Sequence, residues 1–218
     1  MNSELTPFKD RVHAGRLLAG ALRRYAGRDD VVVLGLPRGG VPVAFEVAEA
    51  LHAPLDVIVV RKLGVPGWEE LAMGAISTGG IRVLNEEIIR RAGISREQIE
   101  AVTARELAEL RRRETAFRGR SGTPDIAGKT VLLIDDGIAT GSTIQAAVKV
   151  LRAQKPAAIV IAVPTASVQA FEMLRGEVDD FVSLMIPENF HAVGQWYEDF
   201  DQTSDAGVKA LLAEAANA

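Results

Sequence analysis

The chain has 218 residues, of which 48% are hydrophobic and 25% charged, a balance typical of globular proteins, and this length predicts one α/β domain. Its formal net charge of -4 gives no support for nonspecific nucleic-acid binding, which normally requires a basic face. Because the chain has no cysteine, disulfides, thiolate chemistry and cysteine-bound metals are excluded, and a functional site must use oxygen and nitrogen groups.

The sequence contains neither a membrane-spanning segment nor a secretory signal that we can recognise, and this bears on where in the cell the protein lies. No apolar run approaches the roughly 20 residues that a membrane-spanning helix needs. The first ten residues lack the basic start and the apolar stretch of a secretory signal. We therefore expect a cytoplasmic protein with no membrane partner.

Strands and helices are predicted to alternate along the chain. The first element is an amphipathic helix, Phe8–Tyr25, which we expect to pack on a sheet. Five short apolar runs without period-2 alternation then predict strands that are buried on both faces. These strands are Val31–Leu36, Leu55–Val60, Thr130–Asp135, Ala158–Val163 and Phe181–Met185. The helical segments between them are Pro42–Leu51, Ser142–Ala153 and Val168–Arg175.

This alternation predicts an α/β fold, doubly wound around a mainly parallel five-stranded sheet. We expect a single domain over residues 1–218, with a helical insertion over about 65–128 and a small C-terminal hood over about 186–218. In such sheets ligands bind beyond the carboxyl ends of the strands, so the loops at that edge are the candidates for a functional site.

The loop after the first predicted strand contains Arg38, Gly39 and Gly40. Two glycines let backbone amides approach an anion closely, and Arg38 supplies a fixed positive charge. The alternative is a plain strand-to-helix turn, over which we favour anion binding because of Arg38.

Two cations, Arg61 and Lys62, end the second predicted strand. Both could neutralise an anion at the carboxyl edge of the sheet, although a solvated strand end is the alternative. Trp68, Glu69 and Glu70 follow in a predicted loop, where a contact with metal or substrate and a plain surface role are equally supported.

The insertion contains two recognisable signals. Ala75–Leu84 has Ser-Thr-Gly-Gly between two apolar pieces, which predicts a hairpin. Ser95, with Gln98 three residues later, is typical of a capping box and opens a helix that runs to about Phe117. This helix is rich in arginine and glutamate, a pattern that favours a solvated face over a basic lid for an anion.

The segment 131–144 carries most of the functional argument. Asp135 and Asp136 stand at a strand end and could accept hydrogen bonds from two vicinal sugar hydroxyls. The small-residue loop that follows opens a helix, where backbone amides and hydroxyls can hold a phosphate. This loop consists of Ala139, Thr140, Gly141, Ser142 and Thr143. Alternatively, the aspartates only end a strand and cap a turn.

This segment resembles the signature of the type I phosphoribosyltransferases: four apolar residues, two acidic residues and a loop ending in Thr-Gly-Ser/Thr-Thr. Every position matches. The resemblance implies that Asp135 and Asp136 hold the ribose of 5-phosphoribosyl-1-pyrophosphate and that residues 139–143 hold its 5-phosphate. The whole arrangement of the chain is similar to predicted bacterial members of the family whose acceptors are not established.

The resemblance also implies how pyrophosphate is held. In the family, the loop after the first strand binds pyrophosphate, often with a cis peptide bond. We therefore expect Arg38, Gly39 and Gly40 to bind it and the Pro37–Arg38 bond to be cis. The pair Arg61 and Lys62 resembles one in orotate phosphoribosyltransferases, and it would neutralise the pyrophosphate as it leaves.

The implied function is a phosphoribosyltransferase that uses Mg²⁺ and transfers phosphoribose to an unidentified nitrogenous base, or runs the reverse reaction. Mg²⁺ is expected on the pyrophosphate oxygens rather than on direct protein ligands, since it keeps several waters and prefers phosphate partners. The partners expected are small-molecule substrates, with no nucleic acid, and a homodimer is compatible with the sequence. The alternative function is a non-catalytic regulatory protein that binds the same sugar pyrophosphate.

The acceptor base is expected to bind at the hood. Trp196 or Tyr197 could stack on a planar base while Asp199 reads its polar edge. An equally supported alternative is that these rings pack the C-terminal segment onto the sheet. Ala139 occupies a position where 6-oxopurine phosphoribosyltransferases usually carry an aspartate, which speaks against hypoxanthine-guanine salvage unless another acid such as Asp199 or Asp201 performs the task. An Ala-rich helix, Ala206–Ala218, is predicted to follow the hood aromatics.

Overall fold

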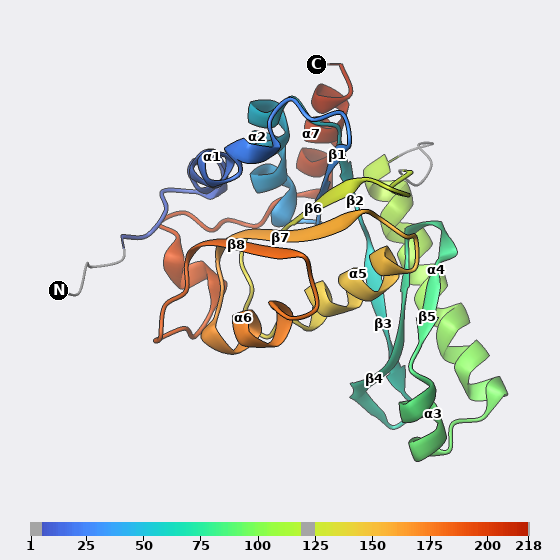
Figure 1. Ribbon diagram of the computed structural model, residues 1–218. Helices are drawn as coiled ribbons and strands as arrows, with labels where there is room; N and C mark the ends of the chain where they lie inside the picture. The colour runs from blue at the N-terminus through green and yellow to red at the C-terminus, as the bar shows by residue number, and fades with distance from the viewer. Residues whose placement is uncertain (1–5, 119–124, 218) are drawn as a thin grey trace.

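The computed structural model describes residues 6–118 and 125–217, and these contain two sheets (Figure 1). The larger sheet is fully parallel, with the strand order β2-β1-β6-β7-β8, and it confirms the predicted doubly wound α/β fold. Its strands are β1 (Val31–Gly35), β2 (Leu55–Val57), β6 (Thr130–Ile134), β7 (Ala158–Thr165) and β8 (Asp180–Met185).

Helices cover both faces of this sheet (Figure 1). On one side lie α1 (Arg11–Ala21), α2 (Gly40–Leu51) and α7 (Asp205–Ala215). On the other side lie α5 (Ser142–Arg152) and α6 (Val168–Leu174). The predicted terminal helix is therefore α7, although Ala218 lies outside the described residues.

Burial of the strands follows from this layering. Along β1, Val31 and Val33 pack toward α1 and α2, whereas Val32 and Leu34 pack toward α5 and α6. The prediction of burial on both faces is confirmed for β1 and β6. It is wrong for β2 and β8, which are half-buried along most of their length because they are the edge strands of the sheet.

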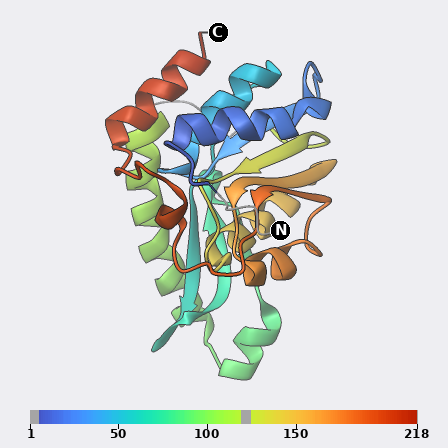
Figure 2. The same cartoon turned by 90° about the vertical axis from the view of Figure 1, so that its left-hand side faces the viewer.

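The second sheet is antiparallel and projects from the β2 edge of the first, as the side view in Figure 2 also shows. Its strands are β3 (Val60–Val65), β4 (Trp68–Ser77) and β5 (Arg82–Leu84). The predicted hairpin is confirmed, because β4 and β5 pair antiparallel around the short helix η2 (Thr78–Gly80).

One predicted strand is in fact two. The run Leu55–Val60 was expected to be a single strand, but β2 ends at Val57 and β3 begins at Val60 in the other sheet. The expectation that Trp68, Glu69 and Glu70 form a loop is wrong as well, because they begin β4. These three residues join a strand because Pro66-Gly67 forms a two-residue turn, which lets Val65 of β3 pair directly with Trp68 of β4.

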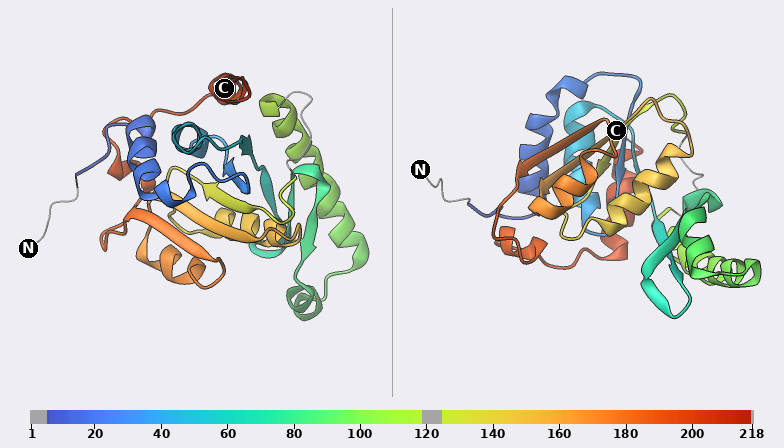
Figure 3. Two further views of the ribbon diagram at one scale, coloured as in Figure 1. Left: turned by 45° about the horizontal axis from the view of Figure 1, so that its top comes forward. Right: turned by 60° about the horizontal axis from the view of Figure 1, so that its bottom comes forward.

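Two helices complete the insertion, so it combines strands with the predicted helical part. These are α3 (Glu86–Ala92) and α4 (Arg96–Arg118). The predicted capping box at the start of α4 is confirmed: Ser95 N donates to Gln98 Oε1 at 2.9 Å, and Gln98 N donates to Ser95 Oγ at 3.3 Å. The far half of α4 packs against α7, and Figure 3 shows these two helices side by side.

The segment before α1 pairs by backbone hydrogen bonds with the C-terminal hood. The predicted helix Phe8–Tyr25 consists of α1 and a short helix η1 (Arg23–Tyr25), and Phe8 precedes α1 in extended form. Phe8 N donates to Trp196 O, and Glu198 N donates to Phe8 O, both at 2.8 Å. These bonds attach the hood, which contains the short helix η3 (Val193–Trp196), to the start of α1.

None of the helices in the two described ranges combines the length and the apolar character that crossing a membrane requires.

Two glycines of α1 should respond oppositely to alanine. At Gly15 an added Cβ would stand 2.8 Å from Glu46 Cβ and 2.9 Å from Val43 O of α2, whereas at Gly20 nothing lies within 4 Å. We expect Gly20→Ala to stabilise the fold by about 0.5–1 kcal/mol through helix propensity. Gly15→Ala should destabilise it by about 1–3 kcal/mol because the helices must move apart. Urea denaturation measures both, and stabilisation by both variants would contradict the close contact of α1 with α2.

Candidate active site

The turn after β1 touches the acid pair after β6. The two strands are neighbours, with Gly35 opposite Ile134, so their carboxyl ends lie together. A side chain at Gly39 would collide with the carboxylate of Asp136, and a Cβ at Gly40 would stand 2.8 Å from Asp135 Cα. Glycine is thus the residue that fits both positions. The bond Pro37–Arg38 in this turn is cis, which confirms the expectation from the family resemblance.

Asp135 and Asp136 form a half-buried pair of carboxylates. Asp135 Oδ1 accepts a hydrogen bond from Asp136 N at 2.9 Å. Burial and the neighbouring carboxylate raise the pKa of Asp135 well above its usual range. Burial also raises the pKa of Asp136, although Arg11 opposes this shift. The pair therefore holds negative charge at a site where water only partly solvates it.

Arg11, from α1, is a site residue that the sequence did not reveal. Its Nε donates to Asp136 Oδ2 at 2.8 Å, and its Nη1 donates to Asp201 O at 2.7 Å. Its guanidinium also lies over the ring of Phe200, with Cζ 3.9 Å from the ring centroid. Tyr197 completes this group by donating its hydroxyl to Asp136 O at 2.6 Å. We call Arg11, Tyr197 and Phe200 the clasp, because the first two bond to Asp136 and the ring of Phe200 packs on both of them.

The hood residues have different surroundings. Tyr197 is buried, its ring packs on Phe8, and burial raises the pKa of its phenol, so the hydroxyl remains a donor. Trp196 is half-buried, and its Nε1 has no hydrogen-bond partner within the described part of the chain. Asp199 is exposed, and its Oδ1 accepts from Asp201 N at 3.0 Å. Tyr197 thus faces the acid pair, while the unpaired Nε1 of Trp196 is enclosed by the protein.

The predicted phosphate loop leads into α5. Gly141, directly before this helix, has a φ of 75°, a left-handed conformation that favours glycine. Ala139, Thr140 and Thr143 are exposed, while Ser142 is half-buried. The loop is tied to the end of β7, because Ser167 Oγ donates to Ala139 O at 2.6 Å. The loop therefore brings two exposed residues with hydroxyls, Thr140 and Thr143, to the N-terminus of an 11-residue helix, the end of a helix that favours anions.

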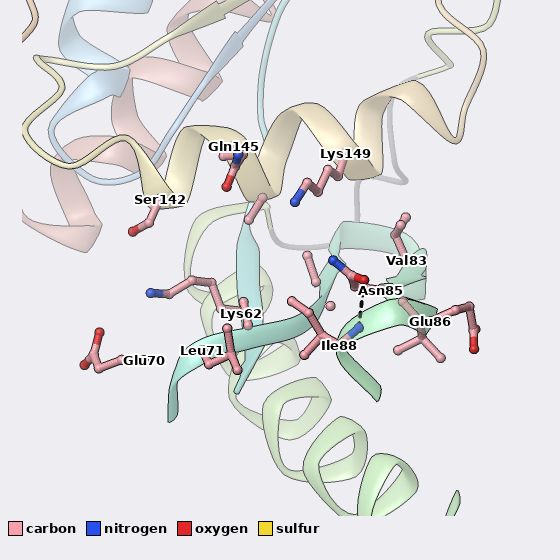
Figure 4. Close-up of a pocket in the computed structure, with 15 residues that line it drawn as sticks. Lys62, Glu70, Leu71, Val83, Asn85, Glu86, Ile88, Ser142, Gln145 and Lys149 are labelled. Atoms are coloured by element: carbon pink, nitrogen blue, oxygen red, sulfur yellow. Dashed lines mark hydrogen bonds between the residues drawn. The ribbon is translucent and has the colours of Figure 1, made fainter. Parts of the chain in front are cut away.

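Arg61 and Lys62 lie on opposite faces of β3. They were expected at the end of a strand, but they occupy its second and third positions, and neighbouring strand residues point to opposite faces. Lys62 lines a cavity of about 470 Å³ and points toward Ser142 of the phosphate loop (Figure 4). Arg61 lines a separate cavity of about 640 Å³ and donates to Glu106 of α4 at 2.8 Å.

Comparison with known proteins identifies relatives over almost the whole chain. A sequence model of the phosphoribosyl transferase domain matches residues 1–200. Two Mycobacterium tuberculosis proteins, named provisionally as phosphoribosyl transferases, are 50% identical over 209 residues, which cover 95% of this chain and 47% of theirs. The chain therefore spans about half the length of these curated relatives.

Solved structures show the same fold. The crystal structure of TT1426 from Thermus thermophilus is 43% identical, covers 96% of this chain and 99% of its own, and has a TM-score of 0.88. The structure of AQ2163 from Aquifex aeolicus covers 93% of this chain and 85% of its own, with a TM-score of 0.51. At 11% identity, this second likeness concerns the fold alone.

Replacing Asp135 with asparagine should stabilise the protein at neutral pH, since it removes a buried charge beside Asp136. The pKa of Asp135 in the folded protein is raised above 3.8, its ordinary value in an unfolded chain. The free energy of unfolding of the wild type therefore falls as the pH rises from 3.8 through the folded-state pKa. The increase in stability that Asp135→Asn gives over the wild type should therefore be largest at a pH above the folded-state pKa of Asp135, and it should vanish below pH 3.8. Thermal unfolding measures it, at about 2–4 °C per kcal/mol for a chain of this size.

The matched control is Asp29→Asn, since Asp29 is exposed. A gain for Asp135→Asn that is equal at every pH, or no larger than the gain for Asp29→Asn, would contradict the buried charge.

Proposed function

The chain belongs to the phosphoribosyl transferase family, and on that premise we propose that it transfers phosphoribose from 5-phosphoribosyl-1-pyrophosphate to a nitrogenous base, or runs the reverse reaction. The observation that carries this proposal is the contact between the glycine turn after β1 and the acid pair after β6. It brings a candidate pyrophosphate site and a candidate ribose site within reach of one small molecule.

In this proposal the sugar phosphate binds at the end of β6. Asp135 and Asp136 accept hydrogen bonds from the two ribose hydroxyls. Arg11 already occupies Oδ2 of Asp136, which leaves Oδ1 for a hydroxyl. The 5-phosphate lies at the N-terminus of α5, where it meets the amides of residues 139–143 and the hydroxyls of Thr140, Ser142 and Thr143.

Pyrophosphate binds at the turn after β1, in the cavity that Arg38 shares with Arg61, while Lys62 lies on the other face of β3. Arg38 contributes charge and the Gly39 amide approaches the phosphate oxygens, while Gly40, whose amide donates to Leu36 O at 3.1 Å, allows the close approach by lacking a side chain. Because Arg61 and Lys62 face opposite sides of β3, they approach from different directions. Arg61 shares its cavity with Arg38, and Lys62 lies toward Ser142.

Mg²⁺ enters the proposal as part of the substrate. Within the described residues, no three His, Cys, Asp or Glu side chains gather in a way that could hold a metal ion. Carboxylate oxygens suit Mg²⁺, and Asp135 and Asp136 are the acids at this edge of the sheet that would face a metal carried by the ligand. When bound to the phosphate oxygens, Mg²⁺ would offset the negative charge of the leaving group.

The chemical step separates charge along the bond from ribose C1 to pyrophosphate. This bond breaks with its electron pair on the leaving oxygen, and a nitrogen of the base forms the new bond to C1. The ribose ring becomes positive in the transition state, and the carboxylates of Asp135 and Asp136 stabilise it. The clasp contributes by fixing the Asp136 carboxylate, so that little reorganisation is needed during the reaction.

The base is proposed to bind beneath the hood. Trp196 offers a half-buried ring, which suits stacking on a planar acceptor. Asp199 is exposed and is proposed to read one of those edges. Tyr197 contributes mainly by holding the backbone of Asp136, which belongs to the proposed ribose site.

Pyrophosphate release tests the proposal. The protein is incubated with 5-phosphoribosyl-1-pyrophosphate, Mg²⁺ and a panel of bases, and we expect release to fall about a hundredfold or more in Asp135→Asn/Asp136→Asn. Asp29→Asn should retain the wild-type rate. Equal rates in wild type and double variant would overturn the proposal. Tight binding of the sugar pyrophosphate without turnover would instead favour the regulatory alternative.

A further inference from the structure

The cavity next to Arg61 collects arginines from three separate elements. Arg38 comes from the turn after β1, Arg61 from β3, and Arg112 and Arg113 from α4. Thr143 of the phosphate loop also lines this cavity, so the cavity adjoins the proposed 5-phosphate site. The arginines of α4 were expected to form a solvated face. Arg112 is exposed, with 68% of its side chain accessible, and Arg113 has 42% accessible, which agrees with a solvated face; both also line this shared cavity.

One carboxylate, that of Glu109, holds the guanidinium groups of Arg112 and Arg113 in place. Glu109 accepts from Arg112 Nε at 2.8 Å and Nη2 at 2.9 Å, and from Arg113 Nε at 2.8 Å. Each guanidinium has five N–H donors, so both arginines keep donors for a ligand after these bonds are made. Fixed guanidinium forks match the oxygens of a phosphate better than freely moving side chains do.

The cavity also contains one acidic side chain, Asp205 at the start of α7. Its Oδ1 lies 3.6 Å from Arg38 Nη1. Among the described residues that line the cavity, Asp205 is the single carboxylate against four guanidinium groups. A carboxylate in this position competes with any anionic ligand for Arg38.

We propose that Arg112 and Arg113 of α4 bind the pyrophosphate group in the cavity that they share with Arg38, and that Asp205 occupies part of this site while no phosphate is bound. The inference rests on the proposed function and adds Arg112 and Arg113 to the residues that bind the pyrophosphate. A rigid helix then supplies the cations. Binding of pyrophosphate displaces the Asp205 carboxylate from Arg38.

Inorganic pyrophosphate with Mg²⁺ is the probe, titrated calorimetrically into the full chain. Arg112→Gln/Arg113→Gln should weaken its binding at least tenfold, or about 1.4 kcal/mol. Arg111→Gln is the control, because Arg111 is an exposed arginine of the same helix that does not line the cavity. Asp205→Asn should act in the opposite direction and tighten binding several-fold. Circular dichroism confirms folding, and the two single variants replace the double variant if it does not fold.

Ribose 5-phosphate serves as the second probe, because it reaches the acid pair and the phosphate loop without a pyrophosphate group. Its affinity should be the same in wild type and in Arg112→Gln/Arg113→Gln. If the double variant binds pyrophosphate as Arg111→Gln does, or if Asp205→Asn weakens binding, this inference is overturned while the proposed function stands. If the wild type binds neither probe, the proposed function falls together with it.

Discussion

The close approach of two backbone segments determines the candidate site. The turn after β1 lies so near the end of β6 that a side chain at Gly39 would collide with Asp136, and one at Gly40 would meet the main chain of Asp135. Parallel pairing of β1 with β6 fixes this distance, because the two strands end side by side. An anion-binding turn and a pair of carboxylates therefore face one ligand, and neither can move away without disturbing the sheet.

Removing a carboxylate from water costs free energy unless it is paired. For the half-buried Asp136, residues that are far away in sequence supply the partners. Arg11 lies in the first helix, whereas Tyr197 and Phe200 lie in the hood, yet all three act on or around Asp136. The two backbone hydrogen bonds between Phe8 and the hood hold these two segments together. The N-terminal helix and the hood are thus parts of the site, and their packing controls how Asp136 is presented to a ligand.

Local signals predicted much of the fold and the site, because the signature at 131–144 and the capping box at Ser95 are each contiguous in sequence. The pairing of β3 was missed because an apolar run does not reveal its partner strand, although the Pro66-Gly67 dipeptide marked the turn. Arg11 was missed for a similar reason. Its contact with Asp136 spans 125 residues, and in the sequence it resembles any arginine of an amphipathic helix.

Calorimetric titration of 5-phosphoribosyl-1-pyrophosphate at millimolar Mg²⁺ into wild type, Gly39→Ala and Gly20→Ala tests the central contact most directly. The wild type and Gly20→Ala should bind one molecule per chain with equal affinity. Gly39→Ala should bind at least tenfold more weakly, because its methyl group displaces the Asp136 carboxylate. Absence of binding heat in the wild type, or undiminished affinity in Gly39→Ala, would contradict the account.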